Sequence, residues 1–112
     1  MVNLESIFKG HGTGKKFTEE IVEILIPKGN IVRLERVVSP ESDKRSKVYD
    51  QDEEEFVMVV KGYAELEFKD GRGKWDRLIM IGGDYITIPP HLRHRVIKTE
   101  EGTTWLALFY KK

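Results

Sequence analysis

The stretch "YDQDEEEFVMVVKG", residues 49–62, passes without a break from an acidic loop into an apolar run that ends at a glycine. Four acids, residues 52–55, directly precede residues 56–60, whose composition is that of a buried strand. Alternate side chains of a strand share a face, so Glu55 shares one with Val57 and Val59. The pattern predicts that Glu55 points inward and that the other three acids are solvated. The alternative is a solvated loop whose last acid only touches the strand.

The chain around this stretch is organised in short runs rich in valine and isoleucine, each bounded by turn residues. From Ile21 onward this pattern indicates about eight strands and an all-β sandwich or barrel. A first antiparallel hairpin is expected around "PKGN", residues 27–30, and a second around "KG", residues 61–62. Prolines 89 and 90 cannot lie in a central ladder, so they mark a strand end or a corner.

The strand expected after "KG" alternates strictly between apolar and acidic residues. Ala64, Leu66 and Phe68 alternate with Glu65 and Glu67. This alternation predicts one buried face and one face in water.

A second feature is the long segment 39–55, which has no strand pattern of its own. Loops of that length are usually functional or disordered, and the first half is expected to be a mobile surface loop.

Length and charge limit the classes of protein to consider. With 112 residues the chain supports one domain, expected over residues 21–112 after an N-terminal arm, residues 1–20. Its formal net charge of zero provides no field for nucleic acid or an anionic membrane. No long apolar run, no secretory signal and no cysteine occur, which predicts a soluble cytoplasmic protein. A high charge content with one glutamine and two asparagines favours a heat-adapted source.

Two segments together resemble the cupin family. The family's second motif is a glycine, five residues, a proline, one residue, usually a glycine, two residues and a histidine; "GDYITIPPHLRH" supplies Gly83, Pro89 and His94, with His91 at the usual glycine. The first motif is histidine, one residue, histidine, three or four residues, glutamate, six residues and glycine. Glu55 and Gly62 match it, while Tyr49 and Gln51 stand at the two histidine positions. The resemblance implies a single antiparallel jelly-roll β-barrel over residues 21–110.

The resemblance also implies a set of metal ligands. Metal-binding cupins typically use three histidines and a glutamate, so the corresponding positions here are Tyr49, Gln51, Glu55 and His94. This oxygen-rich set suits manganese better than iron, nickel or zinc, because an amide oxygen and a protonated phenol are weak ligands. The alternative is no metal, with Glu55 and His94 bonded to each other inside a polar network. Parity supports an inward His94, since it shares a face with Val96.

Two further residues are candidates for a substrate pocket. His91, three residues before His94, is either exposed at the barrel mouth or a substitute ligand or proton carrier. Either Arg33 or Arg36 must face inward if its segment is a strand, and we assign Arg36 to the pocket. An inward arginine can bind a carboxylate through two hydrogen bonds.

The expected function is the binding of a small polar metabolite inside the barrel. The resemblance allows a dioxygenase-, isomerase- or decarboxylase-like activity that depends on a divalent metal. The alternatives are a metal-free ligand-binding barrel and a barrel that only associates with itself. A homodimer is expected, because small cupins commonly pair and open strand edges favour pairing. No nucleic-acid or membrane partner is expected.

Overall fold

The computed structural model describes residues 6–8, 20–26 and 32–111, and every element in them is a strand. The eight strands are β1 (Ile21–Ile26), β2 (Val32–Ser39), β3 (Glu54–Lys61), β4 (Tyr63–Lys69), β5 (Trp75–Ile81), β6 (Tyr85–Ile88), β7 (His94–Thr99) and β8 (Thr103–Tyr110). The expected number of strands is therefore confirmed. No helix in these residues has the length and apolar character needed to cross a membrane.

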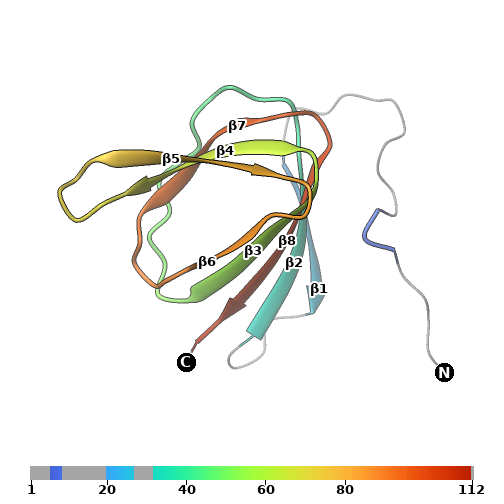
Figure 1. Ribbon diagram of the computed structural model, residues 1–112. Helices are drawn as coiled ribbons and strands as arrows, with labels where there is room; N and C mark the ends of the chain where they lie inside the picture. Colours follow the sequence, from blue (N-terminus) through green and yellow to red (C-terminus); the bar gives the residue numbers. More distant parts are fainter. Residues whose placement is uncertain (1–5, 9–19, 27–31, 112) are drawn as a thin grey trace.

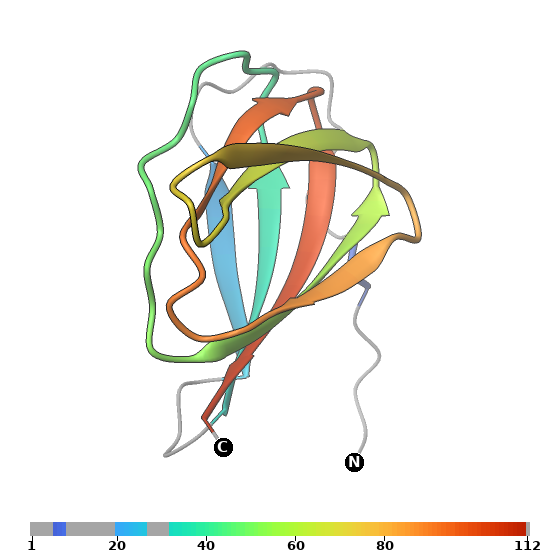
Figure 2. The same ribbon diagram turned by 60° about the vertical axis from the view of Figure 1, so that its left-hand side comes forward.

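The strands form two antiparallel sheets that face each other (Figure 1). One sheet has the order β1-β2-β8-β3-β6 and the other the order β5-β4-β7. The chain passes repeatedly between the sheets, and the hairpin that joins β4 and β5 projects at one side (Figures 1 and 2). This arrangement is the all-β jelly roll expected from the sequence.

The core lies between the two sheets and contains the residues that strand alternation placed there. Val57 and Val59 of β3 are buried, as are Trp105 and Ala107 of β8. Leu66 of β4 packs into the same cluster from the opposite sheet. Burial of a valine or leucine side chain stabilises the fold by about 1.5–3 kcal/mol relative to exposure. Because β3 and β8 are neighbours, their inward residues form one continuous wall.

The first expected hairpin is confirmed and the second is not. β1 and β2 pair antiparallel, although the turn between them lies outside the described residues. β3 pairs with β6 and β8, whereas β4 pairs with β5 and β7, so the chain leaves one sheet for the other at Gly62. Gly62 has a φ of 106°, and a Cβ atom there would lie 2.7 Å from the Cα atom of Thr103. Gly62 therefore makes a corner between sheets, where a side chain has no room.

The acidic face of β4 is not in water, contrary to the expectation from its alternation. Glu65 and Glu67 are only 9% and 8% exposed. The hydroxyl group of Tyr63 donates to Glu65 at 2.6 Å, and Nε of Arg95 donates to Glu67 at 2.9 Å. Arg77 adds an ion pair to Glu65 at 3.4 Å. Long side chains from the same face therefore cover both carboxylates, which sequence alternation alone does not reveal.

Residues 40–53, between β2 and β3, follow the free edge of β7. Ser42 pairs with Thr99 and Tyr49 pairs with His94, both antiparallel. The Tyr49 amide donates to the His94 carbonyl at 2.8 Å, and the His94 amide donates back at 3.1 Å. The segment is thus a hydrogen-bonded edge rather than the free surface loop that we expected for its first half. This edge holds Tyr49 next to His94.

Of the predicted N-terminal arm, residues 1–20, only residues 6–8 and 20 lie within the described part of the chain. The carbonyl groups of Ser6 and Ile7 each accept a hydrogen bond from Nη1 of Arg36 at 3.2 Å. Ser6 and Ile7 therefore contact β2.

Candidate functional site

A cavity of about 240 Å³ lies between the two sheets. Its apolar wall comes from core strands and includes Val57, Leu66, Ile88, Trp105 and Phe109. Its polar wall carries Tyr49, Gln51, Glu55 and His94, together with Glu20, Arg33 and Glu35. An apolar cavity with a few convergent polar groups is the usual form of a small-molecule site in a protein.

Glu55 and His94 meet in this cavity, as strand parity predicted. Glu55 is the second residue of β3 and His94 is the first residue of β7, so each sheet supplies one of them. His94 Nε2 lies 3.6 Å from Glu55 Oε1, and their side chains are only 7% and 12% exposed. Gln51 Nε2 donates to the same carboxylate oxygen at 3.0 Å. The three side chains form a polar network on the wall of an otherwise apolar cavity.

The ring of His94 is held in one orientation. Its Nδ1 lies 2.8 Å from the Leu92 carbonyl oxygen, which only accepts, so Nδ1 carries a proton and Nε2 faces Glu55. Tyr49 and Phe68 stack on the ring, with centroids at 5.6 Å and 5.9 Å. Burial lowers the pKa of His94, but the close Glu55 carboxylate and the hydrogen bond to the Leu92 carbonyl raise it, and the net pKa lies above the ordinary value. The protein therefore favours the imidazolium form more than water does.

Tyr49 lines the cavity beside these groups and keeps its phenolic proton. Burial raises the pKa of Tyr49, and the charges of Glu20, Glu55 and Glu35 raise it further. A phenol in this environment donates a hydrogen bond and does not become a phenolate near neutral pH.

Arg33, not Arg36, is the arginine that reaches the cavity. Arg33, Glu35 and Val37 alternate along β2 and all line the cavity. Arg36 has the opposite parity, is 5% exposed and contacts residues 6 and 7 instead. The assignment of Arg36 to the pocket is therefore wrong.

Local sequence did not distinguish the two arginines, because β2 buries apolar residues on both of its faces. The inward arginine is identified by strand pairing, because Arg33 lies opposite Phe109 and Val37 lies opposite Trp105 on β8. The inward face of β8 thereby identifies the inward face of β2.

His91 lies outside the cavity lining, with 67% of its side chain exposed. Its φ of 64° is unusual for a residue other than glycine, which explains why glycine suits this position in the resembled motif. His91 Nδ1 lies 2.8 Å from Asp50 Oδ1, and the His91 amide donates to the Gln51 carbonyl at 2.7 Å. These two hydrogen bonds hold the backbone next to Gln51 in place. His91 therefore supports the position of Gln51 without lining the cavity itself.

The donor atoms in the cavity do not fit a resident divalent metal such as manganese, iron, zinc or nickel. Within residues 6–8, 20–26 and 32–111, no group of three or more histidines, aspartates and glutamates has the arrangement of a metal site. Glu55 and His94 are the two strong donors among the four expected ligands. The Gln51 amide directs its NH2 group to Glu55, and Tyr49 stays protonated. Two strong ligands are fewer than the three protein ligands typical of catalytic zinc sites.

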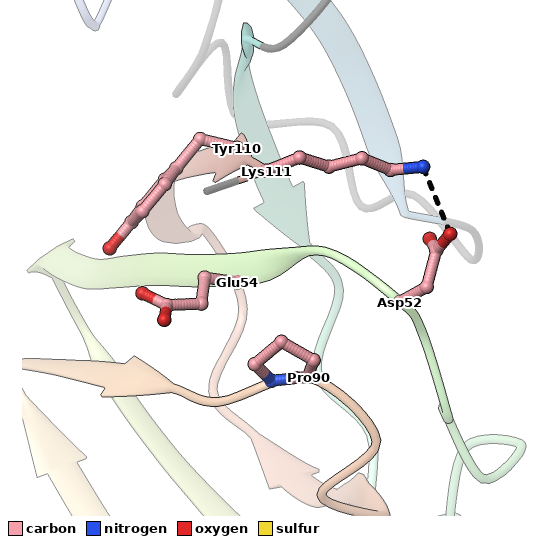
Figure 3. A pocket seen from close by; sticks show the side chains of 5 residues that line it. All are labelled: Asp52, Glu54, Pro90, Tyr110 and Lys111. Atoms are coloured by element: carbon pink, nitrogen blue, oxygen red, sulfur yellow. Dashed lines mark ion pairs between the residues drawn. The ribbon is translucent and has the colours of Figure 1, made fainter.

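A second pocket, also of about 240 Å³, lies near the carboxyl end of β8 (Figure 3). Asp52, Glu54, Pro90, Tyr110 and Lys111 line it. Lys111 Nζ lies 3.0 Å from Asp52 Oδ2, and both side chains are at least half exposed. Solvent screens such a pair more than it screens Glu55 and His94, whose side chains are only 12% and 7% exposed.

No protein-family model matches the chain, and neither does any curated protein sequence. Among solved structures, a Ralstonia eutropha protein provisionally named a mannose-6-phosphate isomerase is 30% identical, covers 99% of this chain and 100% of its own, and superposes with a TM-score of 0.83.

Two more distant structures show the same fold. A cupin superfamily protein from Desulfitobacterium hafniense is 10% identical over 88% of this chain and 83% of its own, with a TM-score of 0.71. A DMSP lyase from Ruegeria pomeroyi is 15% identical over 84% of this chain and 48% of its own, with a TM-score of 0.70. The differing names show that the fold carries more than one activity. With its jelly roll, its matching motif residues and these neighbours, the chain belongs to the cupin superfamily.

Proposed function

We propose that this protein binds a small polar molecule in the cavity between its sheets, and that it does so without a resident divalent metal. The observation that carries this proposal is the convergence of Gln51, Glu55 and His94 on one cavity. A ligand there meets a carboxylate, an imidazole and a phenol within a low-dielectric surrounding, where hydrogen bonds are strong. The apolar wall accepts the hydrocarbon part of the same molecule.

The network also has the groups needed for proton transfer. Because the Leu92 carbonyl holds the Nδ1 proton, His94 exchanges protons with its surroundings through Nε2, which faces Glu55. A raised pKa brings this imidazole toward the range in which general acids work near neutral pH. Three kinds of reaction were considered: dioxygenase-, isomerase- and decarboxylase-like. Of these, an isomerisation by proton transfer requires the fewest chemical groups in addition to Glu55 and His94.

The substrate named for the Ralstonia protein does not suit this cavity. A sugar phosphate carries about two negative charges near neutral pH, while three glutamates line the cavity with one arginine and one histidine. Like charges repel strongly where solvent is excluded. We therefore propose a ligand that is not a phosphate ester.

Two measurements test the proposal. Protein purified without an affinity tag should contain much less than one equivalent of manganese, iron, zinc or nickel by elemental analysis. A screen of small polar metabolites by methyl NMR should find compounds that shift the signals of Val57 and Ile88, which line the cavity. One equivalent of metal that Glu55→Gln removes would contradict the metal-free part. A screen whose hits shift only surface signals would contradict the cavity as the site.

We also propose that the protein forms a homodimer through β1. The apolar strand β8 lies in the middle of its sheet and is mostly buried, so it offers no open edge. β1 is instead an edge strand whose Ile21, Val22 and Ile24 are 43–54% exposed. Open, apolar edge strands favour pairing with another chain. Light scattering should give about twice 13.0 kDa, and Ile24→Lys should return the monomer; a wild-type monomer at all concentrations would contradict this.

A further inference from the structure

Arg33, the one arginine among the described residues that line the cavity, is already neutralised by the protein's own acids. Its Nε lies 2.9 Å from Glu35 Oε2, and its Nη1 lies 3.8 Å from Glu53 Oε1. Its guanidinium group stands over the ring of Phe109, with Cζ 4.2 Å from the centroid. The buried Nε of Arg33 makes no hydrogen bond, so these contacts are ion pairs rather than a hydrogen-bonded clamp. The charge of Arg33 is nevertheless offset by two carboxylates, with which an anionic ligand would have to compete.

The remaining charges of the cavity are predominantly negative. Glu55 is shared by Gln51 and His94, so a charged His94 offsets that one carboxylate. Glu20, next to β1, is the most exposed of the three lining glutamates and thus lies where the cavity opens. Desolvation raises the pKa of Glu20 and the charge of Glu35 raises it further, with no opposing effect from a cation of the described chain. A carboxylate in this position is stabilised by a positive charge brought from outside.

The wall between these carboxylates suits an organic cation with an apolar body. Trp105 lines the same cavity, and aromatic faces attract ammonium groups by about 0.5–2 kcal/mol, whereas the ring of Tyr49 is already occupied by His94 and by Nζ of Lys47 at 5.2 Å. Val57, Leu66 and Ile88 provide apolar surface next to them. Charge, aromatic lining and apolar lining thus occur together in one cavity of about 240 Å³.

We propose that the ligand of this cavity carries a protonated amine, and that Glu20 at the opening selects for it, with Glu35 engaged by Arg33 so that anions are refused. This proposal rests on the proposed function and adds the class of ligand. It is independent of whether a reaction follows binding.

A matched set of three probes tests the charge preference: 2-phenylethylamine, 2-phenylethanol and phenylacetate, which carry a cation, no charge and an anion. Methyl NMR titrations at pH 7 should show the amine binding at the signals of Val57 and Ile88 about tenfold more tightly than the alcohol. Phenylacetate should not shift these signals. Equal or tighter binding of the alcohol or of phenylacetate would overturn the charge preference while leaving cavity binding intact. If none of the three shifts the cavity signals, both proposals fail.

Three variants locate the preference within the protein. Glu20→Gln should reduce the amine's advantage to less than threefold and leave 2-phenylethanol binding unchanged. Asp52→Asn removes an exposed carboxylate outside the cavity, so it should leave all three affinities unchanged. Glu35→Gln frees Arg33 from its shorter ion pair and should allow phenylacetate to bind. An unchanged amine preference in Glu20→Gln would contradict the role of Glu20, whatever the other variants do.

Discussion

The inner cavity and the outer pocket each have a volume of about 240 Å³, and both are lined by residues of the acidic run 52–55. Asp52 and Glu54 line the outer pocket, whereas Glu55 lines the inner cavity. In the outer pocket Asp52 pairs with Lys111 in solvent (Figure 3). In the inner cavity Glu55 meets Gln51 and His94 under cover of the core. Buried polar side chains that converge on one another, not volume, distinguish the inner cavity.

A step of one residue along β3 separates the outer pocket from the inner cavity. Glu54 and Glu55 are consecutive residues of β3, so their side chains leave opposite faces of the sheet. The same charge is worth little where water screens it and much more where the dielectric constant is low. The four acids should therefore respond very unequally to substitution.

The largest effect is expected for Glu55→Ala. Removing this carboxylate leaves Gln51 and His94 without their shared partner, which should lower the free energy of unfolding by about 1–3 kcal/mol. Urea denaturation measures the loss. Glu55→Gln keeps the volume and should recover part of the stability while still abolishing the attraction to an imidazolium. A Glu55→Ala variant as stable as wild type would contradict the network.

The second effect is a pH dependence that comes from His94. Its pKa in the folded protein is raised above the unfolded value of about 6.5, so the stabilisation is fully present below that value. It is lost as the pH rises through the higher folded pKa. Urea denaturation should show wild type losing stability over this range relative to Glu55→Gln, whose His94 lacks the carboxylate. A His91→Gln variant, altered at an exposed histidine, should keep the wild-type dependence of stability on pH. Loss of this dependence in His91→Gln would mean that His91, not His94, causes it.

A smaller effect is expected for Glu53→Ala. Glu53 is not the solvated charge that the sequence suggested, because its side chain is 13% exposed and lies 3.8 Å from Arg33. A long, partly covered ion pair contributes about 0.5–1 kcal/mol, and sodium chloride should weaken it. Chemical denaturation at low and high salt measures the difference from wild type. A loss as large as that of Glu55→Ala would mean that the inner cavity extends further along the run.

The smallest effect is expected for Asp52→Ala. This side chain is 64% exposed and its partner Lys111 is 50% exposed. The lysine lowers the pKa of Asp52 through a hydrogen bond and its charge, but solvent screens the pair. The thermal unfolding midpoint should equal that of wild type within error. A clear shift would show that the outer pocket stabilises the fold.

Several features of this protein follow from the sequence by itself. Alternation is a property of a single strand, so parity with Val57, Val59 and Val96 suffices to point Glu55 and His94 inward. The number of strands and the strand end before Pro89 follow from equally local signals. The motif spacing, read over twelve to fourteen residues, was enough to suggest the cupin barrel.

Other features were decided only by the tertiary structure, because they depend on partners far apart in the chain. Alternation does not say which strand lies alongside, so β3 and β4 looked like a hairpin although Gly62 separates two sheets. Which arginine faces the cavity followed from the pairing of β2 with β8. Glu65 and Glu67 looked solvated until side chains such as Arg95 were seen to cover them. A sequence specifies the face of each strand locally, whereas pairing and charge neutralisation arise only when the sheets assemble.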